Sequence, residues 1–223
     1  MSYKIIRAGE SRSFPEAHAL IDSADRSANS PVYLGVNAGQ SFVRDGANLS
    51  DAEFVLIELA TECLGAYLDE TTTSHDAAQT AKIFGFARFR LGSSEPSNLI
   101  ELVVPAHPNA DALAAARKVF EDAGFVVAVC GDFPGRIVDR LVRPYYNAAL
   151  RRLDEKLATA SDMDMTLRLG LGYPEGPIGL LERTGLEHHY TVTQALYEAL
   201  GDSAYAPARR ATNAFNRAKL LDR

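Results

Sequence analysis

The stretch GDFPGRIVDRLVRP, residues 131–144, marks the point where the character of the sequence changes. Before it, short β-branched or aliphatic runs alternate with helical patterns, and after it the periodic segments are helical. Strands that alternate with helices predict a largely parallel sheet with helices packed against it. We therefore expect an α/β domain over residues 1–131 and an all-helical domain over residues 132–223.

A long helix is expected over residues 134–157. Pro134 would lie in its first turn, where a missing N–H group costs nothing. Apolar side chains recur at steps of three and four and cover a wide arc, so this helix needs partners on more than one side. Pro144 lies inside the pattern and should kink the axis.

The remaining elements follow from the period of the apolar residues and from capping and stop signals. Strands are expected at 3–7, 32–36, 54–59, 66–69, 83–89, 99–104 and 125–129. Helices are expected at 15–23, 74–82 and 109–123, then from a cap at Ser161 to the glycine pair Gly170 and Gly172, and at 185–200 and 208–220.

Composition argues against several classes of protein. A formal net charge of −6 does not fit a nucleic-acid-binding protein. The adjacent His188 and His189 would point about 100° apart on a helix, so no metal site is expected. No run reaches the ~18 apolar residues of a membrane span, and the first residues lack the apolar core of a signal peptide. Cys63 and Cys130 lie in apolar runs typical of reduced core thiols, which predicts a cytoplasmic protein.

Three segments carry a resemblance to a known family. They are DFPGRIVDRLVRPYYNAAL (132–150), SDMDMTLRLGLGYPEGPIGLLERTGL (161–186) and YEALGDSAYAP (197–207). In order and spacing they are similar to the C-terminal domain of the 3-hydroxyacyl-CoA (3-hydroxybutyryl-CoA) dehydrogenases. Upstream, NLIELV and FVVAVC resemble the last strands of that family's nucleotide domain. The resemblance implies a reduced Rossmann-like α/β domain followed by an all-α dehydrogenase C-terminal domain.

The same resemblance implies a reaction and a set of site residues. The reaction is hydride transfer between NAD and the C3 hydroxyl of an acyl-CoA, with a histidine base oriented by a glutamate, and a serine and an asparagine that hold the substrate. The glutamate matches Glu101, the asparagine falls on Asp139, and the serine segment resembles TTTS, where Thr73 keeps a hydroxyl. The histidine falls on Ala87 or Phe89, according to where the gap is placed, and neither can accept a proton.

The glycine fingerprint of a dinucleotide-binding turn, G-x-G-x-x-G, does not occur in residues 1–60. That fingerprint lets the backbone approach a pyrophosphate closely at a helix N-terminus. A positioned general base contributes ~10²–10⁴-fold to a proton transfer. With both features missing, we predict no cofactor site in this chain and little or no NAD-linked turnover by the chain alone.

Each residue carried over from the family also has a purely structural explanation. Asp139 lies one helical turn before Arg143 and can form an i,i+4 ion pair with it. Glu101 can pair with Arg88 or Arg90 on the preceding strand. We expect one of these arginines to reach Glu101, because two carboxylates close together would otherwise raise the pKa of one of them.

The TTTS run can be a capped turn before the 74–82 helix, and His75 beside it is interpreted as a surface histidine rather than a relocated base. If an acyl thioester still binds between the domains, Thr73, Glu101 and Asp139 should converge on it.

Two functions remain open. The chain is an acyl-CoA-handling oxidoreductase, or a subunit of one, in fatty-acid-type or aromatic-acid β-oxidation, with degraded NAD and general-base sites. Alternatively, it is a non-catalytic dimerisation or docking module for a complete dehydrogenase. In both cases the wide apolar face of the 134–157 helix predicts a homodimer through the helical domain. A complete dehydrogenase is a candidate partner and acyl-CoA a candidate ligand, with no nucleic-acid or membrane partner.

Overall fold

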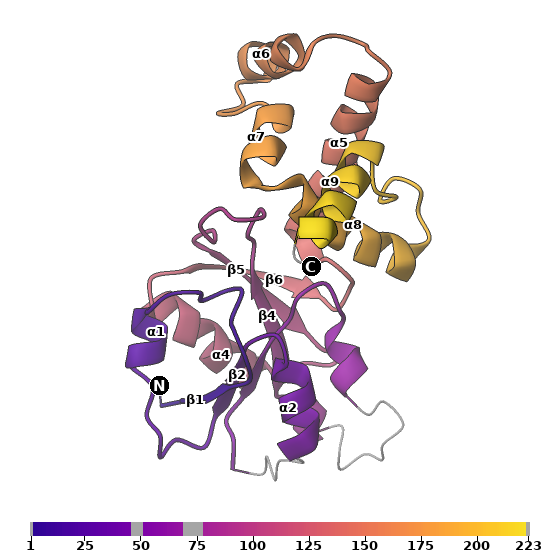
Figure 1. Cartoon of the computed structure of the whole chain (residues 1–223). Helices are drawn as coiled ribbons and strands as arrows, with labels where there is room; N and C mark the ends of the chain where they lie inside the picture. The colour runs from indigo at the N-terminus through magenta and orange to yellow at the C-terminus, as the bar shows by residue number, and fades with distance from the viewer. Residues whose placement is uncertain (1, 46–50, 69–77, 222–223) are drawn as a thin grey trace. The chain divides into compact units, whose positions relative to one another are not determined.

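A computed structural model describes residues 2–45, 51–68 and 78–221 of the chain. The chain divides into two compact units, a sheet unit (Met1–Phe89 and Pro96–Ile137) and a helical unit (Arg90–Glu95 and Val138–Arg223). The predicted fold class, an α/β domain followed by an all-α domain, is confirmed (Figure 1). Compared with the expected boundary after residue 131, the sheet unit continues to Ile137, and the short segment Arg90–Glu95 groups with the helices.

The described part of the sheet unit contains one six-stranded sheet in the order β1-β2-β3-β4-β5-β6. Its strands are β1 (Lys4–Arg7), β2 (Pro31–Leu34), β3 (Val55–Glu58), β4 (Ile83–Arg88), β5 (Leu99–Val104) and β6 (Val126–Gly131). Neighbouring strands are parallel except β4 and β5, which are antiparallel. Every residue of β2 and β3 is buried, as continuous apolar runs in a sheet covered on both faces require.

Helices cover both faces of this sheet. On one face, α1 (Ala19–Asp22) and α4 (Ala110–Asp122) pack on a core that includes Leu56 and Phe84. On the other face, α2 (Ala38–Asp45) and the 3-10 helix η1 (Leu64–Tyr67) pack on a core that includes Ile57. The sheet thus has a separate core on each face. Because successive side chains of a strand point to opposite faces, alternate residues of a strand belong to different cores.

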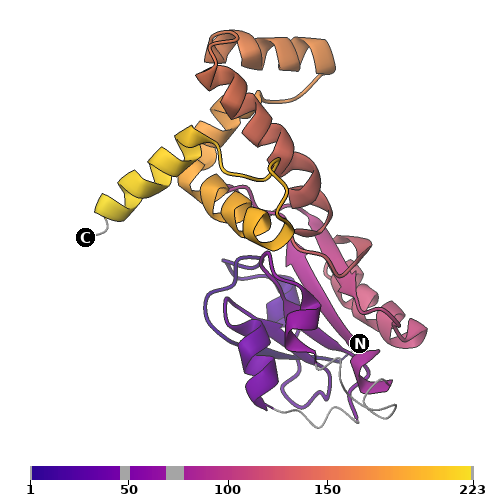
Figure 2. The ribbon, with the colours of Figure 1, turned by 90° about the vertical axis from the view of Figure 1, so that its right-hand side faces the viewer.

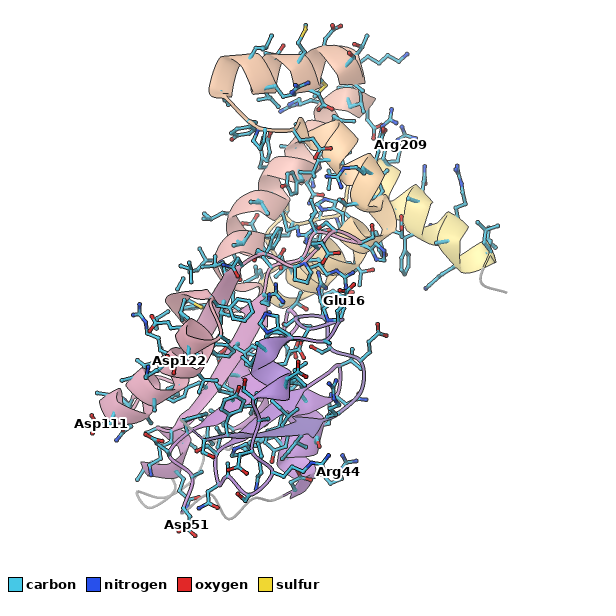
Figure 3. The ribbon with its side chains drawn as sticks, turned by 90° about the vertical axis from the view of Figure 1, so that its left-hand side faces the viewer. Glu16, Arg44, Asp51, Asp111, Asp122 and Arg209 are labelled. Carbon is cyan, nitrogen blue, oxygen red and sulfur yellow. The ribbon has the colours of Figure 1, made fainter. Side chains whose placement is uncertain are left out.

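Helix α4 has a clear start and a clear end. The side chain of Asn109 accepts a hydrogen bond from the amide of Ala112 at 2.9 Å and so caps the first turn. The chain leaves the helix at Gly124, whose φ is +88°. Asp111 and Asp122 lie on its exposed side (Figure 3). The prediction of a helix over residues 109–123 is confirmed.

Several other expected elements differ from the structure. The expected strand at 66–69 is wrong, because its described residues belong to or follow η1. There, the carboxylate of Asp132 accepts hydrogen bonds from the amides of Leu64 and Gly65, both at 2.7 Å, and supports a short helical turn. The expected helix at 15–23 is reduced to α1, and α2 is not predicted at all. The expected helix at 74–82 lies partly outside the described residues. Within its described part, residues 78–80 are helical.

The helices of the helical unit are drawn in salmon through orange to yellow in Figure 2. Its helices are α5 (Arg136–Asp154), whose first two residues group with the sheet unit, α6 (Ala160–Leu171), α7 (Pro177–Thr184), α8 (Leu186–Leu200) and α9 (Arg209–Leu221). The cap of α6 is Thr159 and not Ser161, because the Thr159 side chain accepts from the amide of Asp162 at 3.1 Å. No helix in the described residues is both long and apolar enough to cross a membrane.

The unpredicted helix α7 begins where Asp164 supplies a cap from another helix. Its carboxylate accepts hydrogen bonds from the amides of Ile178 at 2.9 Å and Gly179 at 2.8 Å. These amides have no partner within the helix, so the carboxylate takes the place of a local cap. The short helix therefore depends on α6 for its start.

Pro144 lies inside α5 and lacks the N–H group that would bond to the carbonyl of Arg140, one turn earlier. The hydroxyl of Tyr205 donates a hydrogen bond to that carbonyl at 3.1 Å. Tyr205 is buried and packs against Val192 and Leu196 of α8. A side chain from beyond α8 thus replaces the backbone donor that the proline removes.

Candidate functional site

Glu101 lies on β5 and is buried, with 3% of its surface exposed. Its Oε1 accepts a hydrogen bond from the amide of Ile137, in the first turn of α5, at 2.8 Å. A buried carboxylate needs such donors to replace lost water, and a helix N-terminus also offers a favourable dipole. Glu101 thereby joins β5 to the start of α5.

Ala87 lies directly opposite Glu101 in the antiparallel pair of β4 and β5. Residues directly opposite one another project to the same face of a sheet, here the face covered by α2 and η1. Phe89 lies beyond the last paired residue of β4. The register therefore favours Ala87 over Phe89 as the neighbour of Glu101, and its buried methyl group cannot accept a proton.

Arg88 points away from Glu101. It pairs with Ile100, so it projects to the opposite face of the sheet. Its guanidinium donates to the backbone carbonyls of Ser13 at 2.7 Å, Pro96 at 3.2 Å and Ser97 at 2.9 Å, and lies over the rings of Phe14 and Phe125. The expected compensation of Glu101 by Arg88 is therefore wrong, because side chains alternate along a strand. Arg90 belongs to the helical unit.

The arginine that shares surroundings with Glu101 is Arg136, which no sequence pattern indicates. It is 4% exposed, and its Nη1 donates to the carbonyl of Glu62 at 3.1 Å. Burial raises the pKa of Cys130 to about 11; the charge of Glu101 adds to the rise and the charge of Arg136 opposes it. Both charges therefore act on one thiol. Arg136 has φ +49° and follows Gly135, which has φ +73°. Two consecutive residues with a left-handed backbone conformation therefore form this turn.

Both cysteines are free thiols of intermediate exposure. Burial is the main cause that raises the pKa of Cys63 and of Cys130. Raised values are typical of inert structural thiols and not of nucleophiles. In the part of the chain that the structure describes, no group of three or more His, Cys, Asp and Glu side chains could hold a metal ion.

Asp139 belongs to the helical unit, where it forms the i,i+4 ion pair with Arg143, from Nε to Oδ1 at 2.7 Å. The side chain of Arg143 is fully buried, and its Nη1 lies 3.1 Å from Nδ1 of His189. Nε2 of His189 lies 3.0 Å from Oδ1 of Asn147, whose Nδ2 donates to the carbonyl of Ala204 at 3.1 Å. The charged guanidinium of Arg143 is thus linked by hydrogen bonds to the side chains of His189 and Asn147 within the helical unit.

The donors in this series of hydrogen bonds define the tautomer of His189. A guanidinium can only donate, so Nδ1 of His189 accepts and its proton lies on Nε2, which donates to Asn147. Burial, and then the charge of Arg143, lower the pKa of His189 to about 3. His188 is exposed, so the adjacent histidines face different surroundings.

Of the residues carried over from the family, the structure describes some and not others. Thr73, the TTTS run and His75 lie outside the described residues. Glu101 belongs to the sheet unit and Asp139 to the helical unit. Their expected convergence on one ligand stays a prediction.

A second buried carboxylate, Glu58, ends β3 and is 5% exposed. Its Oε1 accepts from the hydroxyl of Ser11 at 3.0 Å and from the amide of Ser13 at 2.7 Å. Its Oε2 accepts from the amide of Gly35 at 2.7 Å. Gly35 begins the turn that leads from β2 into α2, with φ +117°. Gly35 and Gly39 stand four residues apart, so this strand–turn–helix does not match the fingerprint G-x-G-x-x-G.

Comparison with known proteins assigns the family. Residues 135–222 match the family model of the C-terminal domain of 3-hydroxyacyl-CoA dehydrogenase. Over this helical part, the chain belongs to that domain family. It is similar to a 3-hydroxybutyryl-CoA dehydrogenase of Bradyrhizobium diazoefficiens, with 33% identity over 109 residues, which cover 49% of this chain and 37% of that protein.

A 3-hydroxybutyryl-CoA dehydrogenase of Mycobacterium tuberculosis is 26% identical over an alignment of 237 positions, which covers 90% of this chain and 83% of that protein. The crystal structure of (S)-3-hydroxybutyryl-CoA dehydrogenase from Ralstonia eutropha has the same fold, with a TM-score of 0.69 and 19% identity over 86% of this chain and 67% of that one. The chain aligns with less than half the length of the first curated relatives it matches, 37% and 40%.

Proposed function

We propose that this member of the 3-hydroxyacyl-CoA dehydrogenase family is an acyl-CoA-handling oxidoreductase, or a subunit of one, in fatty-acid-type or aromatic-acid β-oxidation. In this proposal the chain alone has little or no NAD-linked turnover. The names of the relatives, 3-hydroxybutyryl-CoA dehydrogenases, support acyl-CoA as the ligand class. The free thiols of Cys63 and Cys130 support a cytoplasmic location.

The observation that carries the proposal is the pairing of Ala87 with Glu101. In the family a glutamate orients a histidine base, and here the residue opposite the glutamate is a methyl group. Loss of a positioned general base removes ~10²–10⁴-fold of the rate of a proton transfer. Without such a base, the C3 hydroxyl of a bound ligand has no partner to take its proton.

Calorimetric titration with acetoacetyl-CoA tests the acyl-CoA part of this proposal, and steady-state assays with 3-hydroxybutyryl-CoA and NAD test the catalytic part. We expect acetoacetyl-CoA to bind and NAD reduction to stay at background. Turnover clearly above background by the unmodified chain would contradict the proposal, as would the absence of any acyl-CoA binding.

The variant Ala87→His sharpens the same test, with Ala87→Asn as a control of similar polarity that is not a base. Neither variant should gain turnover, because a base alone does not supply a place for the cofactor. The circular dichroism spectrum shows whether each variant folds at this buried position. Activity in Ala87→His but not in Ala87→Asn would mean that the histidine is the only missing part.

A second function, a dimerisation or docking module for a complete dehydrogenase, is supported by α6. No residue of α6 is buried, while Met165, Leu169 and Leu171 are 49%, 80% and 63% exposed. Exposed apolar side chains gathered on one helix mark an interaction site, and a two-fold homodimer is the commonest way to cover such a surface. We therefore propose a homodimer through the helical unit with α6 in the interface.

Light scattering at high micromolar concentration measures the mass of the particle in solution and so distinguishes a dimer from a monomer. The unmodified chain should have the mass of a dimer and Leu169→Glu that of a monomer. Leu220→Glu, the same change at a residue of α9 that is 71% exposed, is the matched control and should stay dimeric. A monomeric unmodified chain would refute the homodimer, and retained mass in Leu169→Glu would exclude α6 from the interface. Mixing the chain with a complete 3-hydroxybutyryl-CoA dehydrogenase tests docking by the same measurement.

A further inference from the structure

We infer that acceptors of the chain itself bind the backbone amides of the turn between β2 and α2, and that this internal ligation closes the turn to a dinucleotide. From the proposed function we take only the identity of the excluded ligand. In dinucleotide-binding sheets a strand passes through glycine into a helix, and the pyrophosphate binds the amides at the start of that helix. Here β2, the turn at Gly35 and α2 have that order. The residues around the turn do not fit the cofactor.

The amides of this turn already have acceptors within the chain. Gly35 donates to Oε2 of Glu58 at 2.7 Å. The next three amides, those of Val36, Asn37 and Ala38, donate to the carbonyls of Glu10 at 3.0 Å, Ala8 at 2.9 Å and Gly35 at 2.9 Å. A pyrophosphate could use these four amides only after their present bonds broke. The segment that follows β1 therefore occupies the hydrogen-bonding positions that a cofactor would need.

Glu58 supplies the negative charge that a phosphate would bring. Its two oxygens accept three hydrogen bonds, from Ser11, Ser13 and Gly35. The hydroxyl of Ser11 in turn accepts from the amide of Phe14 at 2.9 Å, which leaves its proton directed at Glu58. Hydrogen bonds to a charged acceptor are stronger than neutral ones, and a buried carboxylate repels a second anion.

The glycines of the turn serve contacts within the chain. A Cβ at Gly35 would lie 2.5 Å from the carbonyl oxygen of Gly9 and 2.7 Å from that of Ala8. A Cβ at Gly39, in the first turn of α2, would overlap the ring of Tyr67. In a dinucleotide-binding turn the missing side chain admits the pyrophosphate, whereas here it admits the chain's own backbone and an aromatic ring.

The variant Glu58→Ala tests this internal ligation in the full chain. It leaves two amides and a hydroxyl around a space the size of a carboxylate, so a small anion should bind there. We expect the thermal midpoint of Glu58→Ala to fall, and 200 mM sodium formate to raise it by about 3 °C or more above sodium chloride at equal ionic strength. Glu53→Ala, at an exposed glutamate two residues before β3, is the matched control and should show no formate-specific shift.

The unmodified chain gives a readout that does not depend on the variant's folding. Amide exchange followed by NMR should show protection from Gly35 to Ala38, and millimolar NADH should leave the shifts of these amides unchanged. Exchange within the dead time, shifts induced by NADH, or a folded Glu58→Ala without a formate-specific response would each overturn internal ligation. The acetoacetyl-CoA titration reports separately on the proposed function, so failure of one can be told from failure of the other.

Discussion

The two units each bury a charged side chain and neutralise it by different means. In the sheet unit, Glu58 accepts from two backbone amides and a serine hydroxyl. In the helical unit, Arg143 is bonded by the side chains of Asp139 and His189. Backbone donors come from wherever the chain passes, so the first arrangement depends mainly on topology, on the hydroxyl of Ser11 and on the absence of a side chain at Gly35. Side-chain partners can be removed one at a time, so the second arrangement is open to mutation.

The largest effect that tests this difference is expected for Arg143→Ala. The change leaves a cavity and removes the partner of Asp139, so we expect the free energy of unfolding to fall by about 3–5 kcal/mol. Urea unfolding measures it. Arg152→Ala breaks an ion pair with Glu155 whose side chains are 59% and 56% exposed, and should cost less than about 0.5 kcal/mol. Equal effects of the two changes would show that burial of Arg143 adds nothing.

Sequence reasoning recovers the parts of this molecule that depend on local period. The ion pair of Asp139 and Arg143 follows from a spacing of four on a helix, and the fold class follows from the alternation of strand and helix patterns. The contact of Arg143 with His189 joins residues 46 apart, and no periodic signal reveals it. The caps that Asp132 gives to η1 and Asp164 to α7 likewise come from distant segments, so these short elements were missed.

The candidate site shows the same limit. Glu101 could be singled out from NLIE, but which face it occupies depends on its pairing with Ala87, which a sequence with a gap of uncertain position does not define. The expected role of Arg88 failed for this reason. Arg136 follows a Pro-Gly turn with no apolar pattern to indicate that its side chain is buried. The ligation of Gly35 by Glu58 joins residues 23 apart through a backbone amide, which carries no sequence signature.

The pH dependence of stability sharpens the comparison, since His189 can lose its role without any mutation. Its pKa is lowered from 6.5 to about 3 in the folded chain, so the unfolded chain takes up the proton first as pH falls. The stability contributed by neutral His189 is therefore present above pH 6.5 and is lost between 6.5 and about 3. We expect a loss of about 1 kcal/mol between pH 7 and 5.5.

Urea unfolding across this range compares the unmodified chain with His189→Gln, whose amide can also accept and donate. The variant should lack this part of the slope, and the difference between the two curves removes the contribution of the other titratable groups. Parallel curves would mean that His189 is protonated in the folded chain or exposed to water.

An effect of similar size is expected at Tyr205→Phe, which removes the hydroxyl that donates to the carbonyl of Arg140. We expect a loss of about 1 kcal/mol in the free energy of unfolding. With Pro144→Ala in the background, residue 144 regains an N–H group for the same carbonyl, so the loss should fall below about 0.5 kcal/mol. A loss that is unchanged by Pro144→Ala would show that the hydroxyl does not replace the missing backbone donor.

The grouping of Arg90–Glu95 with the helices has a consequence for how the chain can be divided. The amide of Ser93 donates to the carbonyl of Thr184 at 3.0 Å, and a Cβ at Gly92 would overlap that carbonyl. The hairpin between β4 and β5 therefore supplies a piece of the second unit, although residues 135–222 alone match the family's C-terminal domain. A protease that cuts once near residue 137 should yield a helical fragment without this strap. Gene fragments that follow the family boundary would also lack the segment Arg90–Glu95, whereas fragments that encode residues 90–223 would contain it.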